Sequence, residues 1–436
     1  MKYVSFLFLL LLFAGCSSKH TLHVVKYSPD IYDLGHIPQD VDVYASTVVT
    51  NKGIDENLFL QHYFKIWNIT TLPYGVQTIK WPFKYYTYPK VYGENLQPLE
   101  QSFFDSMYDN CNFKAYATLN KRAITLHYSN IRAFPTNRPV LRDPRKAGEG
   151  FPFDYMQVSS IEANKPLFVS HYSKDRKWVY VYSSFTSGWM KANEIVFVDD
   201  DYVEFAQESE SVFIVKEGKA IYDAEGHFLF QSRIGMRLPL VSEDDTSYTV
   251  LVVSKYKANE ALYLEAKISK EIGHKNILEY SSKNVATIIK EVSKTDYSWG
   301  GLYGQRDCSS TLRDYFAPFG IWLPRNSSKQ SKVGDVVSFA GLDEEQKTEL
   351  IKEKAEPFKT LLYKKGHIML YVGIYNDDII IFQNVWGIKT KSWGKEGRII
   401  IGKPIFSTLY LGKHQSDFDA DSSIIKNLKS MNTVIN

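Results

Sequence analysis

Cysteine is scarce in this chain of 436 residues, which has only three. No CxxC pair and no HxxxH spacing is present, so the sequence does not support a zinc site, and we expect neither a metal nor a cofactor. A charge excess of one sign is also missing. The 52 Lys and Arg residues nearly balance the 49 Asp and Glu residues, which argues against a nucleic-acid-binding protein, because such proteins usually have a clearly basic domain.

Long apolar runs are missing as well. The apolar stretch at residues 4–13 follows Lys2 and is too short to span a bilayer. Ala14 and Gly15 then lead directly to Cys16. This start resembles the signal of a bacterial lipoprotein, which is cleaved before a Cys whose thiol then carries a lipid. We therefore predict an exported protein of the cell envelope, anchored by a lipid on Cys16 and on the periplasmic face if the host is Gram-negative. A plain secretory signal with a chance Cys is the alternative.

Apolar spacing divides the rest of the chain into regions. Residues 27–122 mix short helical and irregular stretches, with Leu99, Phe103 and Met107 at helical spacing. From residue 123 to 272 short alternating strands are separated by turns, which is typical of small barrels. The acidic run at 199–201 divides this part into two β-rich modules. From residue 284 to 292 the apolar residues again have helical spacing.

A glycine-rich loop leads to the candidate nucleophile. Residues 297–310 read YSWGGLYGQRDCSS, and the apolar spacing after Cys308 predicts a helix that buries Leu312, Tyr315 and Phe316. Cys308 then lies at the helix N-terminus, where free N–H groups and the helix dipole favour a thiolate. The same N–H groups can stabilise an oxyanion after attack on a carbonyl. We expect Cys111 to be a buried apolar residue rather than a disulfide partner, and Arg306 and Arg313 to be solvated.

A histidine at the head of a strand is the candidate base. His367 begins the apolar stretch 367–375, and turn residues at 376–378 lead into a second strand, which predicts a β-hairpin. If Gln383 lies directly opposite His367, both share a face and Gln383 can orient the imidazole. Asn384 would then point to the other face. Because the register is not determined by the sequence, Asn384 stays open as the alternative.

These motifs resemble the NlpC-type cysteine peptidases of bacterial cell walls. The shared pattern is Tyr-x-Trp-Gly-Gly and Asp-Cys-Ser in residues 297–309, Gly-His at 366–367, and a polar residue on the next strand. Residues 130–136, 151–155, 171–175 and 188–189 resemble the SH3-like barrel that precedes the catalytic domain in one subgroup. The resemblance implies a multidomain chain with a helical or irregular N-terminal domain, two small SH3-like β-barrels and a papain-like α+β peptidase domain.

The resemblance and the residue pattern together give the expected domain bounds. They are the lipoprotein signal 1–16, a tether 17–26, an N-terminal stabilising domain 27–122, the first barrel 123–200, the second barrel 201–272, the peptidase domain 273–415 and a C-terminal tail 416–436.

For catalysis, the resemblance implies a triad of Cys308 as nucleophile, His367 as general base and Gln383 as the polar third member. Related enzymes often have a His at the third position. An amide can fix the tautomer of the imidazole but cannot stabilise imidazolium by charge. Tyr297 matches a tyrosine near the oxyanion site, and we group Ser309 with it as a supporting residue.

The implied substrate is the peptidoglycan stem peptide, cut between γ-D-glutamate and the diamino acid. Asp307 resembles the acidic group that pairs with the free amine of a terminal L-Ala, although it could instead cap the helix. Ser309 and Ser327 match polar positions of that pocket, and Asp154 and Tyr155 are candidates from the first barrel. We expect a monomer that acts on muropeptides during murein turnover or recycling and binds the membrane through its lipid.

Two other functions stay open. Gln383 stands where related enzymes often have a His. This difference is compatible with a non-catalytic wall-binding lipoprotein whose peptidase domain has degenerated. A related amidase or acyltransferase would use the same Cys-His chemistry. If Cys308 and His367 control catalysis, activity falls under acid conditions.

Overall fold

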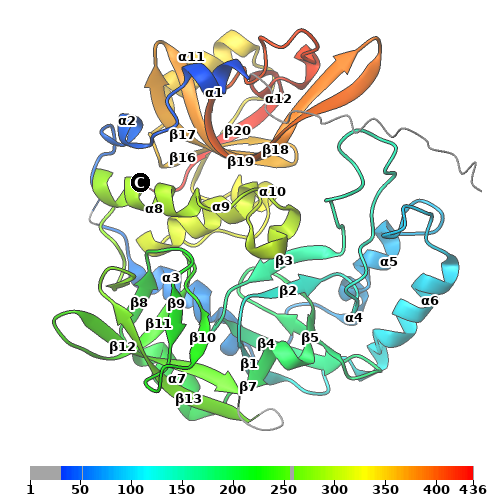
Figure 1. Ribbon diagram of the computed structural model, residues 1–436, viewed down its shortest axis with the longest axis vertical. Helices are drawn as coiled ribbons and strands as arrows, with labels where there is room; N and C mark the ends of the chain where they lie inside the picture. Colours follow the sequence, from blue (N-terminus) through cyan, green and yellow to red (C-terminus); the bar gives the residue numbers. More distant parts are fainter. Residues whose placement is uncertain (1–30, 52, 256–259, 436) are drawn as a thin grey trace, which may run out of the picture. The chain divides into compact units, whose positions relative to one another are not determined.

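The computed structural model describes residues 31–435 except residue 52 and residues 256–259. The predicted signal and tether, including Cys16, lie outside the described residues. In the described part, no helix is both long and apolar enough to cross a membrane. Residues from Ile31 onward belong to one compact unit, which is built from an N-terminal helical region, two β domains and a C-terminal α+β domain (Figure 1).

Short helices make up the N-terminal region. Pro82 stands at the start of α5, where its missing N–H costs no helix hydrogen bond. Phe103 is buried as the helical spacing predicts, together with Phe104. The elements are α1 (Tyr32–His36), α2 (Asp42–Ala45), α3 (Glu56–Phe64), η1 (Lys65–Trp67), α4 (Val76–Ile79), α5 (Trp81–Tyr85), α6 (Gln101–Asn110) and η2 (Phe113–Ala115).

The first two helices pack on the C-terminal domain, as the blue ribbon beside the orange strands in Figure 1 shows. The side chain of Gln39 exchanges two hydrogen bonds with the backbone of Phe406, at 2.8 and 3.0 Å. The Asp33 carboxylate accepts from the backbone and the hydroxyl of Thr408. These contacts fasten the beginning of the described chain to an edge strand of the C-terminal sheet.

The first β domain, residues 121–197, is an antiparallel seven-stranded sheet in the order β3-β2-β6-β5-β4-β1-β7. Alternating apolar residues such as Val179 and Val181 are fully buried in its core. The outer strands β3 and β7 do not pair with each other in the described residues, so the expected barrel is an open sheet. The strands are β1 (Lys121–Thr125), β2 (Ser129–Arg132), β3 (Gln157–Ile161), β4 (Pro166–Tyr172), β5 (Trp178–Tyr182), β6 (Ser187–Lys191) and β7 (Ile195–Phe197); η3 (Ala192–Glu194) precedes β7.

The acidic run between the β domains begins a helix. Asp199 is the N-cap of α7 (Asp200–Glu208), and its side chain accepts from the Tyr202 backbone N–H at 2.8 Å. Asp200 and Asp201 lie in the first turn, where the helix dipole favours negative charge. The run expected to be a break therefore starts an ordered element.

The second β domain, residues 211–275, has a five-stranded sheet in the order β13-β12-β11-β8-β14 and a two-stranded ribbon of β10 and β9. This sheet is also open in the part that the structure describes. Its strands are β8 (Ser211–Ile214), β9 (Ala220–Tyr222), β10 (Phe228–Gln231), β11 (Arg237–Glu243), β12 (Ser247–Lys255), β13 (Ala261–Ser269) and β14 (Gly273–Lys275).

The C-terminal domain packs helices against a six-stranded sheet in the order β15-β20-β16-β17-β18-β19. As predicted, α8 buries Val285, Ile288, Ile289 and Val292. Its elements are α8 (Ser282–Val292), η4 (Trp299–Gly304), α9 (Cys308–Phe316), η5 (Ala317–Phe319), α10 (Ser327–Gln330), β15 (Asp335–Ser338), α11 (Glu344–Lys354), β16 (Thr360–Lys364), β17 (His367–Tyr375), β18 (Asp378–Ser392), β19 (Lys395–Thr408), η6 (Ala420–Ser422), α12 (Ile424–Asn427) and β20 (Leu428–Thr433).

The segment expected to be a C-terminal tail is part of this sheet. Strand β20 pairs with β15 on one side and β16 on the other. Met431 is buried in the core, and the Asn432 amide donates to the backbone of Gln330 and Val333. Residues 428–433 therefore join two strands of the domain rather than trailing from it.

Candidate active site

The glycine-rich loop lies against β3 of the first β domain. Gly300 and Gly301 have φ values of 62° and 77°, a region that L side chains rarely adopt. A Cβ on Gly300 would meet the Gln157 backbone oxygen at 2.8 Å, and the Gly301 carbonyl accepts from Tyr128 at 2.6 Å. The two glycines thus allow this loop to approach β3 closely. The loop then delivers residues 306–308 to the start of α9.

Helix α9 begins at Cys308. Asp307 is its N-cap and forms a capping box with Ser310: the carboxylate accepts from the Ser310 N–H at 2.8 Å, and the Ser310 hydroxyl accepts from the Asp307 N–H at 2.9 Å. Leu312, Tyr315 and Phe316 are buried, which confirms the predicted inward face. Cys308 is 7% exposed and is a free thiol.

The surroundings of Cys308 do not favour a thiolate in the resting protein. Burial and the neighbouring Asp307 carboxylate raise the pKa of the Cys308 thiol to about 12. The backbone N–H groups of Ile368 and Ser309 and the charge of Arg325 lower this pKa, but by less. The expectation from the helix terminus is therefore wrong for the resting state, because desolvation outweighs the N–H groups. A thiolate at Cys308 therefore requires a base that removes the thiol proton.

His367 begins β17, and its imidazole Nε2 lies 2.7 Å from Oε1 of Gln383 on β18. Because an amide oxygen only accepts, Nε2 carries the proton and the neutral ring keeps a lone pair on Nδ1. The Gln383 amide donates in turn to Ser407 at 2.7 Å. Burial, together with the charge of Lys364, lowers the pKa of His367 to about 4. The ring is thus neutral near pH 7.

A β-bulge places Gln383 on the face of His367. Leu370 pairs with Phe382, and the register shifts between Tyr371 and Gly373 before the two-residue turn. In the observed register Gln383 is diagonal to His367 on one face rather than directly opposite it. Without the bulge, the same turn would bring Asn384 to that face. Instead Asn384 points to α9 and donates to the Thr311 hydroxyl at 3.0 Å.

Two cavities lie next to the candidate residues. The larger of the two, about 700 Å³, lies beside Cys308 and has walls from three regions. The N-terminal region, which is predicted to be a stabilising domain, also contributes side chains to this cavity. Among the lining residues are Ile66, Tyr74 and Trp81 from the N-terminal region, Gln157, Tyr180 and Tyr182 from the first β domain, and Asp307, Cys308, Ser309 and Ser327 from the C-terminal domain.

A second cavity of about 330 Å³ contains His367 and Gln383 in its walls. Tyr297 and Gly366 line both cavities. The thiol and the imidazole therefore belong to two neighbouring cavities that meet at Tyr297, and burial raises the pKa of this tyrosine. In the described residues no hydrogen bond joins the Cys308 sulfur to the His367 ring.

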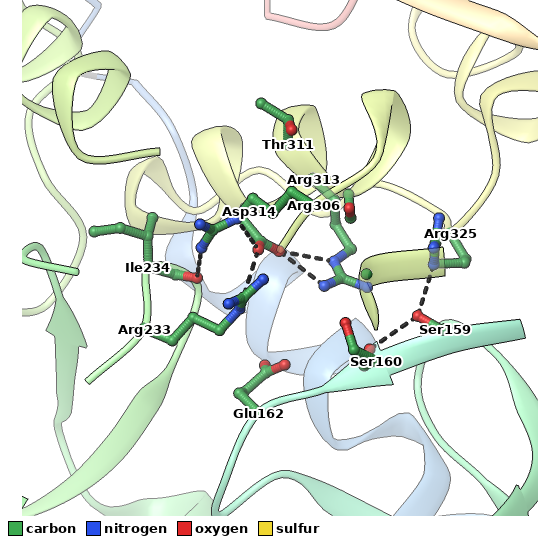
Figure 2. A network of polar contacts seen from close by, with 12 residues as sticks. Ser159, Ser160, Glu162, Arg233, Ile234, Arg306, Thr311, Arg313, Asp314 and Arg325 are labelled. Carbon is green, nitrogen blue, oxygen red and sulfur yellow. Dashed lines mark hydrogen bonds and ion pairs between the residues drawn. The ribbon is translucent and has the colours of Figure 1, made fainter. Parts of the chain in front are cut away.

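Arg325, which no sequence motif indicates, neutralises Asp307. Its guanidinium donates to both carboxylate oxygens, with 2.6 Å to Oδ2, and to the Ser309 hydroxyl at 2.9 Å. It also donates to Ser159 on β3 at 2.6 Å, a contact visible in Figure 2. The carboxylate caps the helix, lines the cavity and pairs with an arginine at the same time. Its pKa is lowered, because the arginine and the hydrogen bonds outweigh burial.

Arg306, expected to be solvated, is fully buried. It donates to Asp314 at 2.8 Å, to Thr295 at 3.0 Å and to Glu217 of the second β domain at 2.9 Å. Figure 2 shows how Arg233 of the second β domain also approaches Asp314. This ion network, defined here as Arg306, Asp314, Glu217 and Arg233, fastens α9 to the second β domain.

Arg313 also departs from the expected solvated position. It pairs with Asp314 at 2.8 Å and stacks over the Phe185 ring of the first β domain at 4.1 Å.

The two candidates from the first β domain have other partners. The Asp154 carboxylate forms a buried ion pair with Arg132 and accepts from the N–H groups of Val140 and Met156. The Tyr155 hydroxyl donates to Glu149 at 2.9 Å, and its ring packs on Trp299. Neither residue lines either cavity. Their contacts support structural roles rather than substrate binding.

Cys111 is 1% exposed and free, in agreement with its predicted apolar role. One group of possible metal ligands occurs in the part described, at the β9–β10 turn: Asp223, Glu225 and His227. Hydrogen bonds within this turn, such as His227 to Asp223, account for the grouping.

The known protein families that match this chain follow the same domain order. Residues 5–116 match the N-terminal stabilising domain of NlpC/P60 proteins, 139–191 an SH3 domain of SH3b1 type, 199–245 an SH3 domain of SH3b2 type, and 294–395 the NlpC/P60 family. The C-terminal domain is an NlpC/P60 domain preceded by two SH3b domains. Peptidases of the NlpC/P60 family are cysteine peptidases. The bounds given from the sequence remain predictions.

Individual proteins are also similar to this chain. The γ-D-glutamyl-L-lysine dipeptidyl-peptidase of Bacillus cereus is 27% identical over 195 residues, which are 43% of this chain and 54% of that protein. A solved structure of an NlpC/P60 endopeptidase from Photobacterium damselae subsp. piscicida is 25% identical and covers 91% of this chain and 97% of its own, with a TM-score of 0.78. The second match extends over all the domains described above.

Proposed function

We propose that the protein is a lipid-anchored cysteine endopeptidase that hydrolyses the γ-D-glutamyl–diamino acid bond of peptidoglycan stem peptides. The observation that carries this proposal is the meeting of two cavities at Tyr297, with Cys308 in one wall and a Gln383-bound His367 in the other. The name of the Bacillus cereus relative, which specifies a γ-D-glutamyl bond, supports the bond type.

The reaction begins with a neutral thiol and a neutral imidazole. His367 removes the Cys308 proton as the sulfur attacks the γ-carbonyl carbon, and the resulting imidazolium gives that proton to the leaving amine when the C–N bond breaks. Water then attacks the thioester with His367 as base and releases the γ-glutamyl product. Gln383 keeps the proton on Nε2 so that Nδ1 can act. Backbone N–H groups at the start of α9 and Tyr297 support the oxyanion.

The acyl part of the substrate occupies the larger cavity in this proposal. Ser327 and the Asp307–Ser309 pair contribute its polar groups, and a free N-terminal L-Ala amine would share the Asp307 carboxylate with Arg325. This arrangement suits muropeptides already released from the sugar, and therefore turnover or recycling of murein. The lipid on Cys16 would keep the enzyme in the cell envelope, at the membrane surface.

Incubation of residues 17–436 with L-Ala-γ-D-Glu-diaminopimelate and mass spectrometry of the products test the reaction. We expect L-Ala-D-Glu and free diaminopimelate from the wild-type protein and from Cys111→Ala, the matched control for the other described thiol. Cys308→Ala and His367→Ala should lose about 10³-fold or more in kcat/KM. Persistent cleavage by Cys308→Ala would refute the nucleophile. In full-length protein, Cys16→Ala should move the chain out of the membrane fraction.

A specific observation favours one alternative, a wall-binding lipoprotein without catalysis. The raised pKa of Cys308 and the uncharged Gln383 are both compatible with an inactive site. A thiol probe distinguishes the two functions: muropeptide binding without cleavage, and without labelling of Cys308 near neutral pH, would support the binding protein.

A further inference from the structure

The second cavity is formed by the C-terminal domain alone and is rich in cations. Its walls contain no Asp or Glu. Lys389 is neutralised by Glu396 and Asp419. The other cations in the walls form no ion pair in the described part of the chain; they are Lys364, Lys365 and Arg398. The cavity therefore has a surplus of positive charge next to His367.

Lys364 is the most unusual of these cations. It is the last residue of β16, pairs across the sheet with His367, and is half-buried. Its ammonium has no hydrogen-bond partner within the described ranges. Burial lowers its pKa, and its charge in turn lowers the pKa of His367. A desolvated ammonium without an anion is unfavourable, so an anionic ligand in this cavity would gain a strong charge-assisted hydrogen bond.

The position of the second cavity indicates which half of the cleaved substrate it binds. Cys308, which takes the acyl group, lines the larger cavity, whereas His367, which protonates the leaving amine, lines this one. The leaving group therefore enters the second cavity. Its remaining walls include the apolar side chains of Trp386, Ile388 and Phe418, which suit the methylene chain of a diamino acid.

We propose that Lys364 determines the specificity for the leaving group by binding a free carboxylate of the diamino acid. This inference rests on the proposed function and adds the chemical nature of the released half. A diaminopimelate at the end of a tripeptide offers two such groups, the α-carboxylate and the side-chain carboxylate. Each of them is an anion that can accept a hydrogen bond from an unpaired ammonium.

Three tripeptides test the proposal: L-Ala-γ-D-Glu-diaminopimelate with both carboxylates free, with the α-carboxylate amidated, and with the side-chain carboxylate amidated. For the wild-type protein, kcat/KM for one of the two amidated peptides should be lower than for the free acid by about tenfold or more. The carboxylate that is amidated in that peptide is the one that Lys364 binds. Lys364→Met should remove most of this preference. Lys364→Arg should retain it, because the charge is kept.

Comparing substrates on one variant separates recognition from catalysis. Any effect of Lys364→Met on the pKa of His367 applies to all three peptides and cancels in their ratio. Lys352→Met, an exposed lysine on α11, is the matched control and should keep the wild-type ratios. Equal cleavage of all three peptides by the wild-type protein, or an unchanged preference in Lys364→Met, would overturn the proposal.

If no peptide is cleaved, the proposed reaction fails, and binding then decides the role of Lys364. Calorimetry with free diaminopimelate and with its amides should show carboxylate-dependent binding to the wild-type protein and weaker binding to Lys364→Met. Binding that is equal for acids and amides would overturn the assignment independently of catalysis.

Discussion

The two SH3b domains follow each other in the chain and are both antiparallel, yet they relate to the active site in different ways. The first contributes β3, β5 and the β5–β6 turn to the wall of the larger cavity. The second contributes no residue to either cavity. Instead its Glu217 and Arg233 reach the buried Arg306 and Asp314 next to α9. One domain lines the cavity beside Cys308, and the other holds the helix that begins at Cys308.

This difference shows that similar modules can contribute to a site in two ways: one lines the cavity, and the other stabilises the helix beside it. The first domain presents mostly neutral side chains, such as Tyr180, Tyr182 and Ser184, to the cavity. The second provides charges that are buried together with their partners. Changes in the first domain should therefore affect substrate binding, and changes in the ion network should affect the stability of the fold.

The largest effect is expected from Arg306→Met in the ion network. This change removes the hydrogen bonds that the buried Arg306 guanidinium donates to Asp314 and Glu217, and it should lower the free energy of unfolding by about 3–5 kcal/mol. Urea denaturation measures it. Arg176→Met, at an exposed position of the first SH3b domain, is the control and should cost less than about 1 kcal/mol. Equal losses in both variants would mean that the network does not stabilise the domain interface.

A smaller effect is expected from a large side chain that fills part of the larger cavity. Ser184→Trp, at the β5–β6 turn, places a large ring in the cavity and should reduce kcat/KM by about tenfold or more, through KM, with little change in melting temperature. Glu225→Trp, at an exposed turn of the second SH3b domain, should leave the kinetics unchanged. Similar kinetic losses in both variants would remove the distinction between the domains.

The smallest effect concerns pH. The base must be neutral, and the pKa of His367 is lowered to about 4, so kcat/KM should be flat near neutrality and fall as the pH drops through about 4. An ordinary histidine would produce the fall near pH 6.5. The charged groups that shift the pKa of His367 are Lys364 and Asp307, and neither belongs to an SH3b domain. Ser184→Trp should therefore leave the midpoint in place; a shifted midpoint would connect the cavity wall to the base.

Local patterns predicted the parts of the site that depend on neighbours in sequence. Helical spacing identified the buried faces of α8 and α9, and turn residues identified the hairpin of β17 and β18. The start of α9 at Cys308 followed from the same spacing. The prediction for Gln383 has the right face but the wrong register, because a single bulge in β17 changes the pairing and leaves no clear signal in the sequence.

Long-range partners could not be predicted. Arg306 looked solvated because its partners Thr295, Asp314 and Glu217 come from separate segments, one of them 89 residues away. Arg325 was overlooked for the same reason, since it joins Asp307 to Ser159 of another domain. The polar sequence of β20 does not indicate a strand that pairs with neighbours on both sides. In each case burial comes from tertiary contacts, which single-sequence periodicity does not contain.

The position of β20 between β15 and β16 has a consequence for the synthesis of the chain. While the chain is still emerging from the ribosome, residues 428–433 are absent, and a gap separates the edge strand β15 from β16 and the rest of the sheet. The two SH3b domains, made entirely of earlier residues, have no such gap. The C-terminal sheet is therefore completed only after β20 has been synthesised.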